Sequence, residues 1–150
     1  MAQRARIDLR VGGEIFPVEA LIENGVCREI RTLKEDCPQR CLPLEQALNE
    51  AIKNRAAKVD FPCDTAAMTP LQKRIFAFMD SAVPPGKTIT YGVLAKVLGT
   101  SPRGVASALA HNPLPLFFPC HRVVGQHGLS GYSLHGLKLK VALLESEKLI

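Results

Sequence analysis

Cys120 and His121 are the residues of this sequence best suited to covalent chemistry, and they are adjacent. A thiol attacks a substrate as the thiolate, and a neighbouring base or positive charge favours that form. His121 can act as such a base, and Arg122 adds a positive charge one residue further along. Because adjacent side chains often point apart, the spacing alone leaves two interpretations open: Cys120 is a reactive nucleophile, or it is a buried structural cysteine.

The residues on either side of this pair indicate how it is held. Two phenylalanines precede Pro119, and two valines follow Arg122, so the chain is apolar on both sides of the thiol. Such a segment is typical of a buried strand or loop edge, and the proline fixes its own φ. We therefore expect Cys120 to occupy a rigid position.

The second half of the chain is expected to form helices at residues 70–81, 91–98, 102–111 and 136–147. Thr69 and Gln72 form a capping-box pattern ahead of the first helix, with proline at its first position. Gly99 closes the second helix and Ser101 caps the third, so these two short helices are expected to form a helix-turn-helix. The buried face of the first helix is predicted to comprise Leu71, Ile75, Phe78 and Met79.

The first half of the chain reads as a small antiparallel sheet, over residues 6–33, followed by a helix. Apolar and charged residues alternate from Ile7 to Val11, as in a half-exposed strand, and Asn24-Gly25 is typical of a tight hairpin turn. Pro17 favours an edge position or a bulge in the second strand. A helix starting at Pro43 has one apolar face, made of Leu44, Ala47, Leu48, Ala51 and Ile52.

These patterns predict an α+β protein with two domains. A small N-terminal α/β domain, an antiparallel sheet plus a helix, is expected over residues 1–62 with its linker. Residues 63–150 are expected to form a mostly helical, winged-helix-like domain that contains the helix-turn-helix. The 150 residues are enough for one ordinary domain or for two small ones that share an interface.

Composition and charge narrow the class of protein. With 47% hydrophobic residues the chain can bury a core, and no apolar run approaches the roughly 20 residues that span a bilayer. The N-terminal residues lack the apolar core of a signal peptide, so a soluble, cytoplasmic protein is expected. The formal charge is +5, from 19 Lys and Arg against 14 Asp and Glu, which modestly favours a polyanionic partner.

The five cysteines are an odd number, so at least one is unpaired within the chain. Free thiols are the default in a reducing cytosol. The spacing of Cys37 and Cys41 would also allow a disulfide that closes a small loop. The sequence alone does not decide whether this disulfide forms. The sequence has no CxxC pair, and no histidine lies near Cys37 and Cys41 to complete a set of zinc ligands. No metal is therefore expected.

The helix expected from residue 102 onward exposes mostly small residues. Its outward positions are Arg103, Gly104, Ala106, Ser107 and Ala110. Only the arginine can make a bidentate contact with a base, so this surface favours close approach to a DNA backbone or narrow groove over reading a sequence. The alternative is that the small residues pack this helix against protein.

The run Pro119-Cys120-His121-Arg122-Val123 resembles the active-site motif of the O6-alkylguanine-DNA alkyltransferases, also called methylated-DNA–protein-cysteine methyltransferases. The similarity continues upstream through residues 112–115 and downstream through residues 130–133, and it covers roughly residues 69–148. The resemblance implies DNA repair by direct damage reversal. One alkyl group moves irreversibly from O6-alkylguanine in double-stranded DNA to Cys120, with O4-alkylthymine as a second candidate substrate. It implies no cofactor and a monomeric protein.

The resemblance also implies roles for single residues. Cys120 is the nucleophile, His121 its base through a water, and Glu147 the acid that orients the histidine, with Glu145 as the nearby alternative. Asn112 braces the active-site turn. Tyr91 and Arg103 assist nucleotide flipping from the minor groove. The remaining residues expected to contact DNA or the flipped base are Ser101, Gly104, Ala106, Ser107, Arg122, Val123, Tyr132 and Ser133.

Two other functions fit parts of the pattern. A non-catalytic protein that binds alkyl lesions would leave Cys120 inert. A helix-turn-helix transcription regulator would prefer one DNA sequence, which the small-residue helix disfavours. A Cys-His hydrolase is a weaker alternative, because no oxyanion hole is identified.

Overall fold

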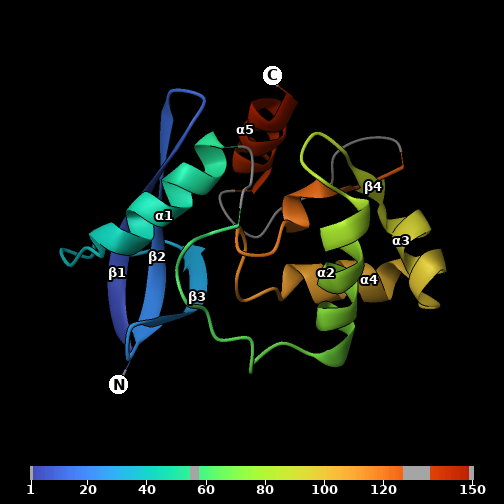
Figure 1. Ribbon diagram of the computed structural model, residues 1–150, viewed down its shortest axis with the longest axis horizontal. Helices are drawn as coiled ribbons and strands as arrows, with labels where there is room; N and C mark the ends of the chain where they lie inside the picture. The colour runs from blue at the N-terminus through green and yellow to red at the C-terminus, as the bar shows by residue number, and fades with distance from the viewer. Residues whose placement is uncertain (1, 55–57, 127–135, 149–150) are drawn as a thin grey trace.

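The computed structural model describes residues 2–54, 58–126 and 136–148 (Figure 1). The elements follow the chain as β1 (Gln3–Val11), β2 (Glu14–Glu23), β3 (Val26–Thr32), α1 (Leu42–Lys53), α2 (Pro70–Ala82), β4 (Ile89–Thr90), α3 (Tyr91–Leu98), α4 (Pro102–Ala110), the 3-10 helix η1 (Cys120–Arg122), β5 (Val123–Val124) and α5 (Gly136–Lys148). The sheet and α1 form one side of the molecule, and α2, α3 and α4 form the other (Figure 1). The predicted α+β class is confirmed.

The N-terminal sheet is antiparallel, with β2 between β1 and β3. The turn between β2 and β3 has positive φ at Asn24 (52°) and Gly25 (76°), as the sequence predicted. Alternate side chains of β1 are buried, and these are Ala5, Ile7, Leu9 and Val11. This alternation gives the sheet one face for a core and one for solvent.

Pro17 lies in the central strand rather than in an edge strand. It pairs with Asp8 of β1, but the pairing with β3 begins only at Val18. At Pro17, β2 is therefore locally an edge, which is where a strand tolerates a residue without an N–H. The register shift of this strand lies elsewhere, between Leu21 and Ile22.

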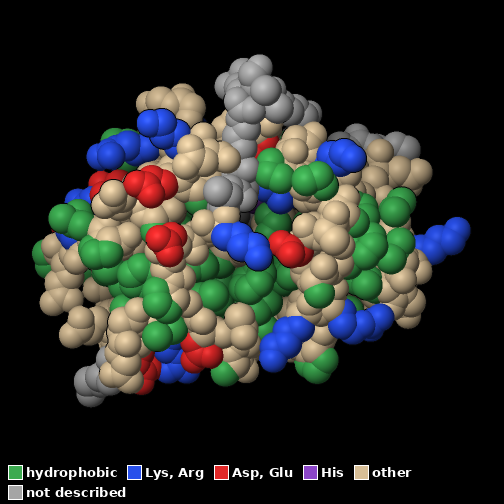
Figure 2. All heavy atoms as spheres, viewed as in Figure 1, with side chains coloured by type: hydrophobic (Ala, Val, Ile, Leu, Met, Phe, Trp, Pro, Cys, Tyr) green, Lys and Arg blue, Asp and Glu red, His purple; other side chains and the backbone are tan. Residues whose placement is uncertain are grey.

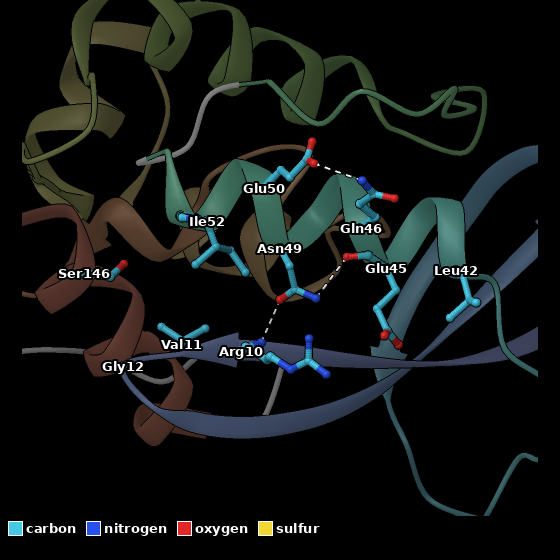
Figure 3. Close-up of a pocket in the computed structure, with 11 residues that line it drawn as sticks. Arg10, Val11, Gly12, Leu42, Glu45, Gln46, Asn49, Glu50, Ile52 and Ser146 are labelled. Carbon is cyan, nitrogen blue, oxygen red and sulfur yellow. Dashed lines mark hydrogen bonds between the residues drawn. The ribbon is translucent and has the colours of Figure 1, made fainter.

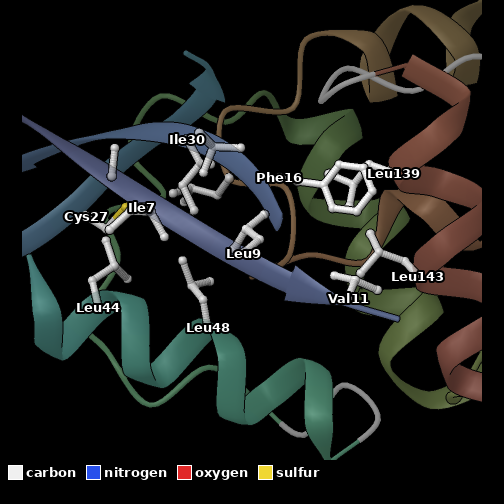
Figure 4. Close-up of a cluster of buried hydrophobic side chains, with 13 residues drawn as sticks. Ile7, Leu9, Val11, Phe16, Cys27, Ile30, Leu44, Leu48, Leu139 and Leu143 are labelled. Atoms are coloured by element: carbon white, nitrogen blue, oxygen red, sulfur yellow. The ribbon is translucent and has the colours of Figure 1, made fainter. Parts of the chain in front are cut away.

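Two helices from distant parts of the chain bury the same face of the sheet (Figure 4). Leu44 and Leu48 point from α1 toward the sheet, and both are 0% exposed. Leu139 and Leu143 of α5 approach the end of β1, beside Phe16. Because α5 belongs to residues 63–150 and yet completes the core of the sheet, the two halves share one apolar cluster. The domain boundary near residue 62 stays a prediction.

The helices of the second half begin and end where their capping residues predict. Thr69 and Gln72 form the complete capping box of α2. Ser101 accepts a hydrogen bond from the Gly104 N–H at the start of α4, and Gly99 ends α3 with φ of 69°. The two helices are packed against each other, whereas their use as a DNA-binding helix-turn-helix stays a prediction.

The buried face of α2 differs from the predicted one. Ile75 and Met79 are buried as expected, but Leu71 and Phe78 are only partly buried. Gln72 and Phe76 take the buried positions instead. Contacts made far away in sequence explain this rotation, because the Gln72 amide donates to the Ala108 carbonyl of α4 (2.9 Å) and the Phe76 ring packs on Phe118, with 5.1 Å between ring centroids.

The described surface has several hollows, and two of them border α1 and α2. One, about 440 Å³, is lined by residues between 58 and 68, by α2 and by residues 117–119. Figure 2 shows hydrophobic side chains gathered in this central part of the face, with charged side chains beside them. The other, about 690 Å³, lies between α1 and the end of β1 (Figure 3), where Asn49 bonds the backbone of Asp8 and Arg10. No described helix is long and apolar enough to cross a membrane.

Candidate active site

Cys120 is the first residue of η1 and is held by its backbone. Its N–H donates to the Phe118 carbonyl (2.8 Å), and the Arg122 N–H donates to the Pro119 carbonyl (3.2 Å). The residue is 5% exposed. The turn around Cys120 is thus hydrogen-bonded through its backbone and its side chain is buried, so a group that is to react with this thiol must be brought to it.

His121 is buried and bonded to Glu147 of α5. The distance from Nε2 to Oε1 is 2.7 Å, and the two residues are 2% and 3% exposed. Burial lowers the pKa of His121, although the bond to Glu147 opposes this effect. Burial alone would raise the pKa of Glu147, but hydrogen bonds from His121 and Arg122 outweigh it and lower that pKa to about 2. The carboxylate is thus ionised, so Nε2 carries the proton and Nδ1 carries the lone pair of the neutral ring.

Arg122 is turned inward, toward Glu147. Its Nε lies 3.1 Å from both carboxylate oxygens, and its Nη2 lies 2.8 Å from Oε1. Its Nη1 donates to the Val83 carbonyl at 3.1 Å, and the residue is 4% exposed. From the sequence, this arginine was expected among the residues that contact DNA. The structure instead places it behind the site, because a buried carboxylate needs a buried countercharge.

Lys140 is a buried residue beside the site that was not expected from the sequence. It is 0% exposed, and its Nζ donates to the Val123 carbonyl at 2.7 Å. Its position in α5 carries a signal, since residues 139, 140, 143, 144 and 147 follow helical spacing and all are buried. A lysine and a glutamate on the apolar face of a helix indicate buried ionic chemistry.

Asn112 braces the turn that leads to Cys120. Its Oδ1 accepts from the Leu114 N–H (3.0 Å), and its Nδ2 donates to the Phe118 carbonyl (3.4 Å), the same carbonyl that the Cys120 N–H contacts. Within this turn Leu116 has φ of 77°, which is uncommon for a residue with a side chain. Asn112 thus ties the backbone of this turn together, and its part in the reaction stays a prediction from the resemblance.

The residues expected to contact DNA lie mainly at the start of α4. Ser101, Arg103, Ala106 and Ser107 are exposed. Gly104 is half-buried, and a Cβ there would lie 3.1 Å from Thr100 Oγ1 and 3.2 Å from Ser101 Oγ, so the capping turn itself favours glycine. Tyr91 is half-buried at the start of α3, and Val123 is buried. Tyr132 and Ser133 lie outside the described residues.

The cysteines other than Cys120 lie in or beside the N-terminal core. The thiols of Cys27, Cys37, Cys41 and Cys63 are free, so Cys37 and Cys41 do not form a disulfide. Burial raises the pKa of Cys27 to about 12 and also raises that of Cys63, so neither is a ready nucleophile. Among the described residues, no three His, Cys, Asp or Glu side chains are grouped so that they could hold a metal ion.

Sequence comparisons match mainly the half of the chain that contains this site. A methylated-DNA–protein-cysteine methyltransferase of Thermococcus gammatolerans is 46% identical over 80 residues, which are 53% of this chain and 45% of that protein. A protein of the same name from Methanocaldococcus jannaschii is 59% identical over 64 residues, which are 43% of this chain and 38% of that protein. The chain therefore matches less than half the length of these curated relatives.

Solved structures match nearly the whole chain. The crystal structure of Mycobacterium tuberculosis OGT in complex with DNA is 29% identical, with a TM-score of 0.74 over 97% of this chain and 92% of that one. The O6-methylguanine-DNA methyltransferase of the hyperthermophilic archaeon Pyrococcus kodakaraensis is 27% identical, with a TM-score of 0.67 over 97% and 99% of the two chains.

The family model for the DNA-binding domain of 6-O-methylguanine DNA methyltransferase matches residues 70–149, more than half of the sequence. This match includes Cys120, His121 and Glu147. The chain belongs to the 6-O-methylguanine DNA methyltransferase family.

Proposed function

We propose that this protein repairs DNA by moving an alkyl group from O6 of guanine to Cys120, once per molecule. The observation that carries the proposal is the buried arrangement around the thiol. Cys120 directly precedes His121, whose Nε2 is bonded to an ionised Glu147 that Arg122 also holds. This arrangement supplies a nucleophile, a base and a fixed counter-charge for the base.

In the proposed reaction, His121 first accepts the thiol proton through a water, using Nδ1. The resulting imidazolium is stabilised by Glu147 on its other side. The Cys120 sulfur then attacks the alkyl carbon, so that a C–S bond forms as the C–O6 bond breaks. The electron pair of the broken bond leaves with guanine, and Tyr91 is the candidate proton donor for it. The thioether has no route back to the thiol, so the protein does not turn over.

Double-stranded DNA that contains O6-alkylguanine is the proposed partner. The thiol is buried, so a base inside a duplex must leave the stack to reach it, at a cost of a few kcal/mol. Arg103 is exposed at the start of α4, where it can enter the space that a flipped nucleotide vacates. The carbonyl of Val123, with Tyr132 and Ser133, is the proposed edge that recognises guanine. The chain acts as a monomer without a cofactor in this proposal, and O4-alkylthymine is a second candidate substrate.

Intact-mass measurement after incubation with a duplex that contains O6-methylguanine tests this function. We expect a gain of about 14 Da, one methyl replacing one hydrogen, that stops at one per molecule and maps to Cys120. The Cys120→Ala variant should bind the duplex and gain no mass. Tight binding of the lesion by the wild-type protein without any mass gain would contradict transfer and favour the lesion-binding alternative.

A further inference from the structure

The hollow between α2 and residues 117–119 is lined by most of the phenylalanines of the chain. It has a volume of about 440 Å³. Four of the six phenylalanines line it, and these are Phe61, Phe76, Phe117 and Phe118. Phe76 is buried, but the other three are only partly buried, so part of their apolar surface meets water. An apolar group that enters the hollow would remove this surface from water, which is favourable.

One stripe of α2 forms a wall of this hollow. Lys73, Phe76, Ala77 and Asp80 all line it, at successive spacings of three, one and three residues. Residues three, four and seven apart lie on the same face of a helix. Lys73 and Asp80 are seven residues apart, which is roughly 10 Å along the helix axis. The wall is therefore apolar in the middle, with a cation at one end and an anion at the other.

The charged groups of the hollow favour a ligand that carries a single negative charge. Lys58 and Lys73 line the hollow and are exposed. Within the parts of the chain that the structure describes, neither ammonium group forms an ion pair. Each can therefore attract an anionic group, whereas Asp80, which also lines the hollow, repels a second negative charge.

The size and the lining of the hollow match those of small-molecule sites. Such sites are concave, roughly 300–1,000 Å³ in volume and mostly apolar, with a few polar groups that fix the orientation of the ligand. Aromatic rings pack on one another in offset or tilted arrangements. Phe76 and Phe118 already form one such pair, with 36° between the ring planes. A third ring, supplied by a ligand, can extend this packing.

We propose that this hollow is a binding site for a small aromatic anion with one negative charge, such as an aromatic carboxylate or sulfonate. The ring of the ligand packs against Phe118, and its anionic group faces Lys73. The site is separate from the proposed alkyl transfer but adjoins it. Phe118 and Pro119 line the hollow, and the Phe118 carbonyl accepts the hydrogen bond of the Cys120 N–H. A ligand in the hollow thus contacts the turn that holds the thiol.

The test uses the full chain without DNA and two fluorescent probes. Anilinonaphthalenesulfonate is a singly charged aromatic anion, and phenylnaphthylamine is its neutral counterpart. We expect the anion to bind saturably, at one per chain, and more tightly than the neutral probe. Ala77→Phe fills the hollow and should weaken binding of the anion about tenfold or more. Ala82→Phe is the matched control and should match the wild type, because Ala82 is also exposed on α2 but does not line the hollow.

The charge of Lys73 is tested separately. Lys73→Met should weaken binding of the anion about twofold to fivefold, the effect of one exposed ion pair, and should leave binding of the neutral probe unchanged. Lys96→Met is the control, because this exposed lysine belongs to α3 and does not line the hollow.

The cysteines locate the bound probe. Cys63 lines the hollow, whereas Cys41 is also partly buried but lies outside it. Labelling with N-ethylmaleimide, read by peptide mass spectrometry, should become slower at Cys63 when anilinonaphthalenesulfonate is bound. The rate at Cys41 should not change.

Failure of both probes to bind saturably would overturn the proposal. Binding that is as tight in a folded Ala77→Phe as in the wild type would also overturn it, because the probe would then lie elsewhere. Equal affinity for the two probes would reject an anion site and favour a purely apolar contact with a partner protein. If Ala77→Phe does not fold, labelling of the wild type decides. Protection at Cys63 but not at Cys41 supports the site, and unchanged labelling of Cys63 contradicts it.

Discussion

Two buried carboxylates, Glu19 and Glu147, are held by similar partners in different parts of the molecule. Glu19 in β2 is 4% exposed and accepts hydrogen bonds from Arg4 of β1 and Arg31 of β3. Glu147 in α5 is 3% exposed and is bonded to Arg122 and His121 of η1. For each carboxylate, burial alone would raise the pKa, and hydrogen bonds to its partners lower it instead.

The difference lies in the partners and in what adjoins them. The side chains of Arg4 and Arg31 are 38% and 43% exposed, so water reaches the cations around Glu19. The side chains of Arg122 and His121 are 5% and 3% exposed, and the histidine is next to a thiol. A buried carboxylate with a lowered pKa is thus no mark of function by itself. Glu147 differs from Glu19 in having a neutral, titratable partner next to a thiol, and this difference is why the proposed reaction involves Glu147.

The largest expected effect separates the two carboxylates by activity. Glu147→Gln removes the charge that orients His121 and stabilises its protonated ring, so the single-turnover rate of methyl transfer should fall about 100-fold or more. Glu19→Gln should leave that rate within about twofold, because no reacting group depends on it. Rates are measured by quenched mass spectrometry at saturating duplex. Equal losses in the two folded variants would remove the distinction.

The second prediction concerns stability. Arg122→Met leaves the Glu147 carboxylate buried beside an apolar side chain, so the free energy of unfolding should fall by about 3–5 kcal/mol. Arg31→Met should cost about 1 kcal/mol or less, because water reaches this arginine and Arg4 remains bonded to Glu19. Urea unfolding followed by circular dichroism measures both. Similar losses would show that the exposure of the cations does not matter.

The third prediction concerns the stability of the protein at acidic pH. Glu147 has a pKa lowered from 4.5 to about 2, so its contribution to stability is complete above about pH 4.5 and is lost as the pH falls toward 2. That contribution is about 3 kcal/mol at most by linkage. The difference in unfolding free energy between wild type and Glu147→Gln should therefore shrink across this window. A difference that stays constant with pH would mean that Glu147 is not ionised in the folded protein.

The smallest expected effect is on DNA affinity. Arg103→Ala should weaken duplex binding and lower the slope of log affinity against log salt by about one, because the side chain that enters the vacated space also brings one cation close to the DNA backbone. Lys138→Met is a suitable control, since this exposed lysine is paired with Glu14 away from α4. Fluorescence anisotropy at several salt concentrations measures the effect. An unchanged slope in Arg103→Ala would remove this residue from the DNA surface.

Local patterns predicted the fold well. The capping residues Thr69 and Ser101, the turn at Asn24 and the alternation in β1 each act within a few residues, so their consequences can be read from the sequence. The same information placed Glu147 in the last helix. Its bond to His121 spans 26 residues and was expected only through the family resemblance.

Features set by packing were harder to predict. The inward turn of Arg122 depends on Glu147, which lies 25 residues away, and the rotation of α2 depends on the α4 carbonyl that Gln72 contacts. Lys140 was missed because a lysine is ordinarily assigned to the exposed face of a helix, although its spacing placed it on the buried one. In each case a polar side chain is buried by a partner that helical periodicity does not reveal.

The most direct test of the account is a double-mutant cycle on the methyl-transfer rate. Its central claim is that Glu147 acts through His121, so the two side chains work as one unit. Single-turnover rates are compared for wild type, His121→Gln, Glu147→Gln and the double variant, all at saturating duplex and with folding checked by circular dichroism. We predict that the double variant is no slower than the slower single variant, because either change removes the same step. Losses that multiply would contradict the claim and show that the two residues act independently.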